Sequence, residues 1–184
     1  MEIQARSGLV IPWAHRSLFL YRFRSSCAEF PGSYDHEYTD AATFAEWGVD
    51  FLKYDRCFKP SEASTALLYR KMGYALRHSG RDILYSACSW GVDDTHKWIK
   101  TTGAHMWRTT GDINDSWESI KTLYEKNKEI LPFSAPNCFG DMDMLVVGLK
   151  GHGNVSNQEN ILSFEEYKLH FSLWALFGSP LMIG

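Results

Sequence analysis

Residues 49–55, VDFLKYD, form a strand-like run from Val49 to Tyr54 that stops at an acidic residue, Asp55. Side chains alternate between the two faces of a strand, so Lys53 and Asp55 share one face. A nearby ammonium group favours the ionised carboxylate and lowers its pKa, which suits a nucleophile. An aspartate after a strand is also a common turn former or helix N-cap, so this run alone leaves both interpretations of Asp55 open.

Similar runs recur along the chain and alternate with amphipathic helical patterns. The predicted strands are residues 18–23, 49–54, 82–87, 105–108, 130–134 and 180–183. The predicted helices are residues 40–47, 64–78, 95–101, 116–128 and 163–176. Strands that alternate with helices favour a parallel α/β fold, and the absence of a repeat or linker in the sequence favours a single domain.

Two architectures fit this alternation, a doubly wound sheet and a TIM barrel. A doubly wound sheet would carry a Gly-rich phosphate turn after its first strand, and the sequence has none there. A barrel places functional residues at the carboxyl ends of several strands. Polar and ionisable residues do follow the predicted strands: Asp55, Ser89, Arg108 with Asp112, and Asp141 with Asp143. Turns are polar in any fold, but four such strand ends favour a site.

The composition excludes some function classes. The net charge is −3 and no run of Lys or Arg is longer than two, so nucleic-acid and membrane-surface binding have no electrostatic support. Aromatic residues make up 15% of the chain, which is typical of a packed aromatic core and also of a sugar site, where rings stack on pyranose faces. No stretch is long enough to span a bilayer, and no signal peptide is legible at the N-terminus.

Metal and serine-hydrolase chemistry are not indicated. The four cysteines lack the paired spacing of a zinc site, and the acidic pairs lack the further oxygen ligands of a calcium loop. No G-x-S-x-G motif is present. We therefore expect no metal and no cofactor. Asp112 could cap a helix that begins near residue 115, so its local sequence does not assign it a catalytic role.

Seven segments, in order, resemble the melibiase family, glycoside hydrolase family 27, which includes α-galactosidases and α-N-acetylgalactosaminidases. They are CAEFPGS (27–33), DAATFAEWGVDFLKYD (40–55), SACSWG (86–91), WRTTGDI (107–113), DMDML (141–145), HFSLWA (170–175) and SPLMIG (179–184). The resemblance covers roughly residues 27–184. It implies a (β/α)₈ barrel that hydrolyses terminal α-galactosides by double displacement with retention of configuration.

The resemblance also implies roles for individual residues. Asp55 matches the nucleophile and Asp112 the acid/base, and retaining enzymes need such a pair of carboxyl groups. The residues that match substrate-binding positions are Lys53, Ser89, Arg108 and Asp143, and those that match a disulfide pair are Cys27 and Cys57. Ser89 matches the residue that contacts the substituent on sugar carbon 2, with Val92 beside it, and leaves galactose and N-acetylgalactosamine both open.

The sequence departs from the family pattern in three places. Residues 1–26 do not resemble the family's first strands, Met142 replaces a usual proline, and the sequence ends at the expected eighth strand. We therefore expect residues 1–184 to form a partial barrel of about strands three to eight, without a C-terminal β-sandwich. The alternatives are an α-N-acetylgalactosaminidase and an inactive sugar-binding fragment.

The expected partner is an α-galactoside or a related oligosaccharide. The oligomeric state is left open, and so is a cytoplasmic or secreted location, although the matched cysteine pair favours an oxidising compartment.

Overall fold

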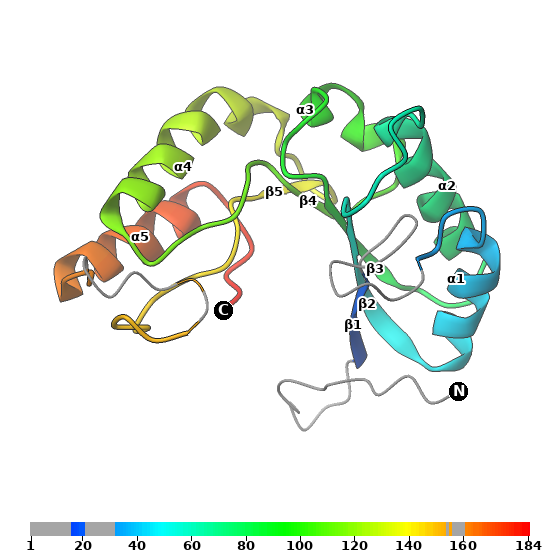
Figure 1. The fold of residues 1–184 in the computed structure, drawn as a ribbon, viewed down its shortest axis with the longest axis horizontal. Coiled ribbons are helices and arrows are strands. Elements are labelled where there is room, and N and C mark those ends of the chain that lie inside the picture. Colours follow the sequence, from blue (N-terminus) through cyan, green and yellow to red (C-terminus); the bar gives the residue numbers. More distant parts are fainter. Residues whose placement is uncertain (1–15, 21–31, 154, 156–160) are drawn as a thin grey trace. The chain divides into compact units, whose positions relative to one another are not determined.

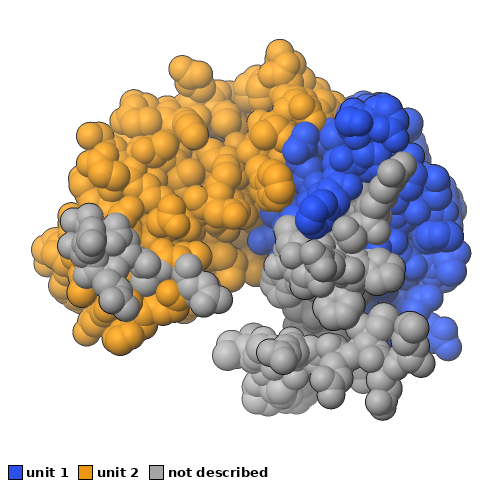
Figure 2. Space-filling model, in the orientation of Figure 1, with its two compact units in different colours: residues 1–88, 101–104 blue, residues 89–100, 105–184 orange. Residues whose placement is uncertain are grey.

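The computed structural model describes residues 16–20, 32–153, 155 and 161–184 (Figure 1). The chain divides into two compact units, which Figure 2 colours separately. Unit 1 comprises residues 1–88 and 101–104, and unit 2 comprises residues 89–100 and 105–184. None of the helices in the described part of the chain has the length and apolar character that crossing a membrane requires.

Unit 1 is a parallel sheet with helical connections. Its elements are β1 (Arg16–Leu20), α1 (Glu37–Glu46), β2 (Val49–Asp55), α2 (Thr65–Arg77) and β3 (Leu84–Cys88). β2 pairs with β1 on one side and with β3 on the other, and all three strands are parallel. The register sets Lys53 opposite Ser86 and Asp55 opposite Cys88. Asp55 therefore lies at the carboxyl end of the middle strand of this unit.

The helix α2 lies within the range 64–78 that the sequence predicts. Ser64 caps its first turn, because the Ser64 hydroxyl accepts a hydrogen bond from the Leu67 amide at 3.4 Å. Gly73 lets the helix approach the Thr102 carbonyl so closely that a Cβ atom would lie 1.9 Å from that oxygen. On β2, alternation turns Leu52 and Tyr54 to a fully buried face, while Lys53 is half-buried.

Unit 2 contains two paired strands and the longest helix of the described chain. Its elements are α3 (Thr95–Trp98), β4 (Met106–Arg108), α4 (Trp117–Ile130), the 3₁₀ helix η2 (Leu131–Phe133), β5 (Phe139–Asp141) and α5 (Phe164–Leu176). A short 3₁₀ turn, η1 (Ile99–Thr101), follows α3. β4 and β5 are parallel, with Arg108 opposite Asp141. Polar residues again follow the carboxyl ends of the strands.

The core of unit 2 lies among α4, α5 and the segment that follows β5. Its buried members are Ile113, Ile120, Leu123, Met142, Leu145, Val146, Leu162, Tyr167 and Trp174. α5 begins with a capping box, in which the Ser163 hydroxyl accepts from the Glu166 amide and the Glu166 carboxylate accepts from the Ser163 amide. Both halves of the capping box are therefore present at the start of α5.

The parallel α/β prediction is confirmed, but two predicted strands are wrong. Residues 130–134 are the end of α4 and the 3₁₀ helix η2, because the amphipathic repeat of α4 continues into them and Pro132 cannot donate to a strand ladder. Residues 180–183 form only an isolated bridge, between Leu145 and Ile183. The predicted strand 18–23 overlaps β1, and its last three residues lie outside the described residues.

Candidate functional site

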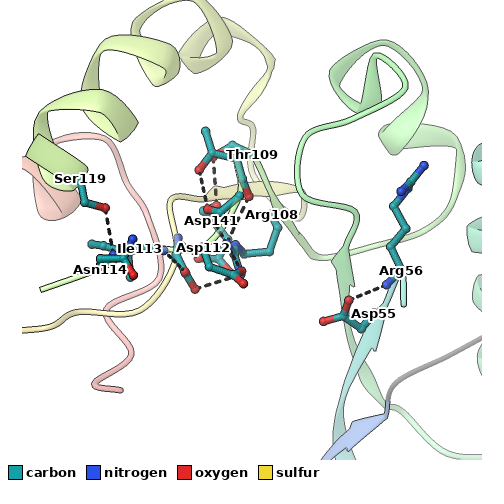
Figure 3. Close-up of polar contacts among 12 residues, drawn as sticks. Asp55, Arg56, Arg108, Thr109, Asp112, Ile113, Asn114, Ser119 and Asp141 are labelled. Carbon is teal, nitrogen blue, oxygen red and sulfur yellow. Dashed lines mark hydrogen bonds and ion pairs between the residues drawn. The ribbon is translucent and has the colours of Figure 1, made fainter. Parts of the chain in front are cut away.

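Asp55 ends β2 as a buried carboxylate, 7% exposed. Its Oδ1 atom accepts a hydrogen bond from the backbone amide of Arg56 at 2.6 Å (Figure 3). Lys53 lies two residues earlier on the same face of the strand. The strand end therefore presents a buried carboxylate that accepts a backbone N–H.

A cluster of buried tyrosines packs in unit 1 around the preceding residue. The Tyr54 and Tyr69 rings meet edge to face with centroids 5.7 Å apart, and the Tyr85 hydroxyl donates to the Tyr69 carbonyl at 3.1 Å. Burial raises the pKa of Tyr69, and electrostatic interactions with Cys88 and Asp55 add to that rise. The Tyr69 phenol therefore stays neutral beside the Asp55 carboxylate over the ordinary pH range.

Arg108 is the centre of the polar cluster in unit 2 (Figure 3). It ends β4 and is 2% exposed. Its Nη1 atom lies 3.0 Å from Asp143 Oδ1, and its Nη2 atom lies 3.0 Å from Asp112 Oδ1. Nη2 also donates to the Gly111 carbonyl at 2.7 Å. One buried guanidinium thus holds two carboxylates and the turn between Arg108 and Asp112.

The two carboxylates held by Arg108 differ in their exposure. The Asp112 side chain is 74% exposed, whereas that of Asp143 is 7% exposed. Asp112 is therefore open to a ligand or to water while it is tethered at one oxygen. A carboxyl group in this position can exchange protons with a bound molecule, which is the requirement for a general acid or base.

Asp143 is bonded at every polar group. Its Oδ2 atom accepts from the Ile113 amide at 2.7 Å, and its own amide donates to Asp141 Oδ1 at 2.9 Å. Its carbonyl accepts from the indole N–H of Trp174 at 2.7 Å. Its φ angle is +84°, a left-handed conformation that non-glycine residues seldom adopt. The sequence assigned no role to Trp174, which lies in the segment HFSLWA (170–175) that resembles the family.

Ser89 lies at the start of a loop with an unusual backbone. The loop residues Trp90, Gly91, Asp93 and Asp94 all have positive φ angles, between 52° and 69°. Ser89 is fully buried, and its hydroxyl lies 2.9 Å from the Thr95 hydroxyl. Since Thr95 donates its proton to the Val92 carbonyl at 2.6 Å, Ser89 is the donor to Thr95. The hydroxyl predicted to meet a sugar is thus engaged inside the loop.

The predicted disulfide lies only partly within the described residues. The predicted disulfide joins Cys57 to Cys27, and Cys27 lies outside the described residues, so this pairing stays a prediction. Cys88 and Cys138 are buried, and neither forms a disulfide. Burial raises the pKa of the Cys138 thiol. In the described residues, no group of three or more His, Cys, Asp or Glu side chains could hold a metal ion.

Known sequences resemble this chain over most of its length. A melibiase family model, described as "Alpha galactosidase A", matches residues 18–184. Alpha-galactosidase 3 of Arabidopsis thaliana is 45% identical over 163 residues, which are 86% of this chain and 34% of that protein. An alpha-galactosidase of Cyamopsis tetragonoloba is 44% identical over 154 residues, again 34% of its length. The chain thus spans about a third of the length of these relatives.

Solved structures are similar in fold. Alpha-galactosidase I from Mortierella vinacea superposes with a TM-score of 0.82 at 29% identity, over 92% of this chain and 46% of that one. An alpha-galactosidase from Saccharomyces cerevisiae, solved with raffinose, superposes with a TM-score of 0.78 at 30% identity, over 90% of this chain and 40% of that one.

Proposed function

Because the chain belongs to the melibiase family, glycoside hydrolase family 27, we propose that it carries the catalytic carboxyl groups of an exo-acting α-galactosidase. The observation that carries this proposal is the exposed carboxylate of Asp112, held at 3.0 Å by a buried arginine at the end of β4. A carboxyl group fixed at one oxygen and open at the other suits proton transfer to a leaving group.

The proposed reaction is a double displacement with retention. In the first step, the Asp112 carboxylic acid protonates the glycosidic oxygen while an Asp55 oxygen attacks the anomeric carbon. The bond from that carbon to the leaving oxygen breaks, and a galactosyl ester forms on Asp55. In the second step, Asp112 removes a proton from water, the water oxygen attacks the same carbon, and Asp55 is released as a carboxylate.

The surroundings of Asp55 support its role as the nucleophile. The Arg56 amide donates to Oδ1, and burial keeps the carboxylate largely out of bulk water. Lys53, on the same strand face, supplies a positive charge. The proposed sugar ligands are Lys53, Arg108, Asp143 and Ser89; the first two carry the donors that galactose hydroxyls require. The Ser89 hydroxyl would have to leave Thr95 to reach a sugar.

We further propose that the described strands are part of a (β/α)₈ barrel. Parallel strands alternate with helices in both units, and an α-galactosidase structure matches at a TM-score of 0.82 over 46% of its own length. A partial barrel exposes strand edges, so we expect the isolated 184-residue chain to turn over substrate slowly.

Hydrolysis of an aryl α-galactoside by the purified chain tests the proposal. Asp55→Asn and Asp112→Asn should each lower kcat at least about a hundredfold, because each removes a group that reacts in the transition state. Asp82→Asn is the matched control, since Asp82 is exposed and distant in sequence from both carboxyl groups. The same background rate of hydrolysis in the wild type and in all three variants would identify an inactive fragment instead.

The match at Ser89 leaves an α-N-acetylgalactosaminide as the alternative substrate. Aryl α-galactoside and aryl α-N-acetylgalactosaminide should be compared at equal concentration, as values of kcat/KM. Preference for the acetylated sugar would identify an α-N-acetylgalactosaminidase, with the same two carboxyl groups in the same roles.

A further inference from the structure

Two side chains of α5 reach the segment that carries Asp143. The Trp174 indole N–H donates to the Asp143 carbonyl at 2.7 Å. One turn earlier, the His170 Nε2 atom accepts from the Val146 amide at 3.1 Å. The two rings are both fully buried and meet edge to face with centroids 4.1 Å apart. α5 therefore holds the segment from Asp143 to Val146 by two hydrogen bonds between its side chains and the backbone of that segment.

The backbone conformation at Asp143 is unfavourable without such support. Its φ angle of +84° lies in the left-handed region, which disfavours a residue with a Cβ atom. A strained conformation persists only where its surroundings hold it in place. The amide of Asp143 is held by Asp141 Oδ1 at 2.9 Å and its carbonyl by Trp174. These two bonds fix the peptide groups on either side of the Asp143 side chain.

A direct chain of contacts leads from Asp143 to the exposed carboxylate. Asp143 Oδ1 lies 3.0 Å from Arg108 Nη1, and the same guanidinium lies 3.0 Å from Asp112 through Nη2. Arg108 is almost fully buried, and the carboxylate that faces it offsets the cost of burying the guanidinium charge. Asp143 Oδ2 also accepts from the Ile113 amide, directly after Asp112. Asp143 thus holds Asp112 from two sides.

We propose that Trp174 is a positioning residue for the acid/base carboxyl group. Its indole N–H fixes the left-handed turn at Asp143, Asp143 fixes Arg108 and the Ile113 amide, and these set the position of Asp112. This inference rests on the proposed function of Asp112. It assigns a role in catalysis to a side chain of α5 that touches no substrate.

The competing explanation is that Trp174 only fills the core of unit 2. A packing role predicts less folded protein, and equal losses of rate on every substrate. A positioning role predicts a loss that depends on the leaving group. A good aryl leaving group departs with little protonation, whereas an alkyl or sugar leaving group needs the proton from Asp112.

The test is Trp174→Phe, which keeps a buried ring and removes the N–H donor. The control is Leu123→Ala, which opens a cavity in the same core and touches none of the contacts above. For each, kcat/KM, which reports the first displacement only, is measured on a nitrophenyl α-galactoside and on an α-linked galactose disaccharide. We expect the ratio of the two rates to change about tenfold in Trp174→Phe, against the disaccharide, and to stay constant in Leu123→Ala. An unchanged ratio in Trp174→Phe would overturn the proposal.

A second measurement does not require turnover. Hydrogen exchange of the Ile113 amide reports its bond to Asp143 Oδ2. Trp174→Phe should lower the protection of this amide at least about tenfold relative to the Ile120 amide in α4, because loss of the Trp174 bond frees Asp143. An unchanged relative protection would also overturn the positioning role. Failure of the wild type on both substrates, with the exchange result as expected, would refute the proposed function and leave the structural link intact.

Discussion

Arg108 holds one buried carboxylate and one exposed carboxylate. Asp143 is 7% exposed and meets the guanidinium inside the protein, where an unpaired charge would be costly. Asp112 is 74% exposed, where water screens the same interaction and weakens it. The tether to Asp112 is thus the weaker of the two, and a ligand can compete for this carboxylate without unpairing the buried arginine.

His170 links the stability of unit 2 to pH. Burial lowers the pKa of its side chain from an ordinary 6.5 to about 4, against a smaller opposing effect of Asp115. The folded state therefore keeps a neutral imidazole, which accepts the Val146 amide, while the unfolded chain takes up a proton below pH 6.5. Stability from this group is complete above pH 6.5 and is lost as the pH falls towards 4.

The expected loss can be measured by urea unfolding. Between pH 7 and pH 4.5 the free energy of unfolding should fall by about 2 kcal/mol more in the wild type than in His170→Gln, which accepts the same amide and does not titrate. His78→Gln is the control, because His78 is exposed on unit 1. Identical pH slopes in the wild type and His170→Gln would show that His170 is not held neutral.

At the scale of the elements, the loop from Ser89 to Thr95 is tightly constrained. Gly91 has a φ angle of +69°, and a Cβ atom there would lie 1.9 Å from the Thr109 carbonyl oxygen. The loop packs on the backbone that follows β4, directly before the turn that carries Asp112. Both the left-handed angle and the close approach require glycine.

Gly91→Ala should destabilise unit 2 by more than about 3 kcal/mol, because it adds a steric clash with backbone to the cost of the left-handed angle. Gly148→Ala separates the two effects. Gly148 has a φ angle of +85° with nothing within 4 Å of the added Cβ atom, so this variant should lose only about 1 kcal/mol. The midpoint of thermal unfolding checks both. Equal losses would mean that the loop moves away from Thr109 at little cost.

The sequence predicted the helices better than the strands, for a local reason. Ser64, Ser116 and Ser163 each mark a helix start by a hydrogen bond within the first turn, so the signal and the structure lie in the same few residues. β5 reads Phe-Gly-Asp, and two of these residues disfavour strands. Its pairing with β4, thirty-three residues earlier in register, makes it a strand, and no local pattern carries that information.

The residues of the site also divide into those with a local signal in the sequence and those without one. Strand-end positions and the family resemblance pointed to Asp112, Arg108 and Asp143, and the structure brings these three together within unit 2. The contact between Trp174 and Asp143 spans thirty-one residues, and the resemblance of residues 170–175 to the family does not indicate it. The bond from Ser89 to Thr95 was equally invisible, because it depends on the left-handed residues of the loop between them.

At the scale of the molecule, large apolar side chains remain exposed along α5 and the residues around it. Those between residues 161 and 184 are Ile161, Phe164, Leu169, Phe171, Leu176, Leu181 and Ile183, with exposed fractions from 44% to 78%. Single exposed apolar residues are normal on protein surfaces, but seven within twenty-four residues are a source of hydrophobic association. The Trp174 and His170 side chains of α5 thus bond the segment from Asp143 to Val146, while apolar side chains at other positions of α5 are exposed to water.

The purified chain should therefore associate as its concentration rises, and polar substitutions on α5 should reverse this. Phe164 and Leu176 are 75% and 78% exposed, so the double variant Phe164→Gln, Leu176→Gln loses apolar area without opening the core. If both side chains are buried on association, each contributes about 1.5–3 kcal/mol, and the dissociation constant should rise at least about a hundredfold. Sedimentation equilibrium measures this constant. The matched control is Tyr38→Gln with Leu67→Gln on unit 1, at 54% and 61% exposure. An equal rise in both double variants would mean that association is not governed by α5.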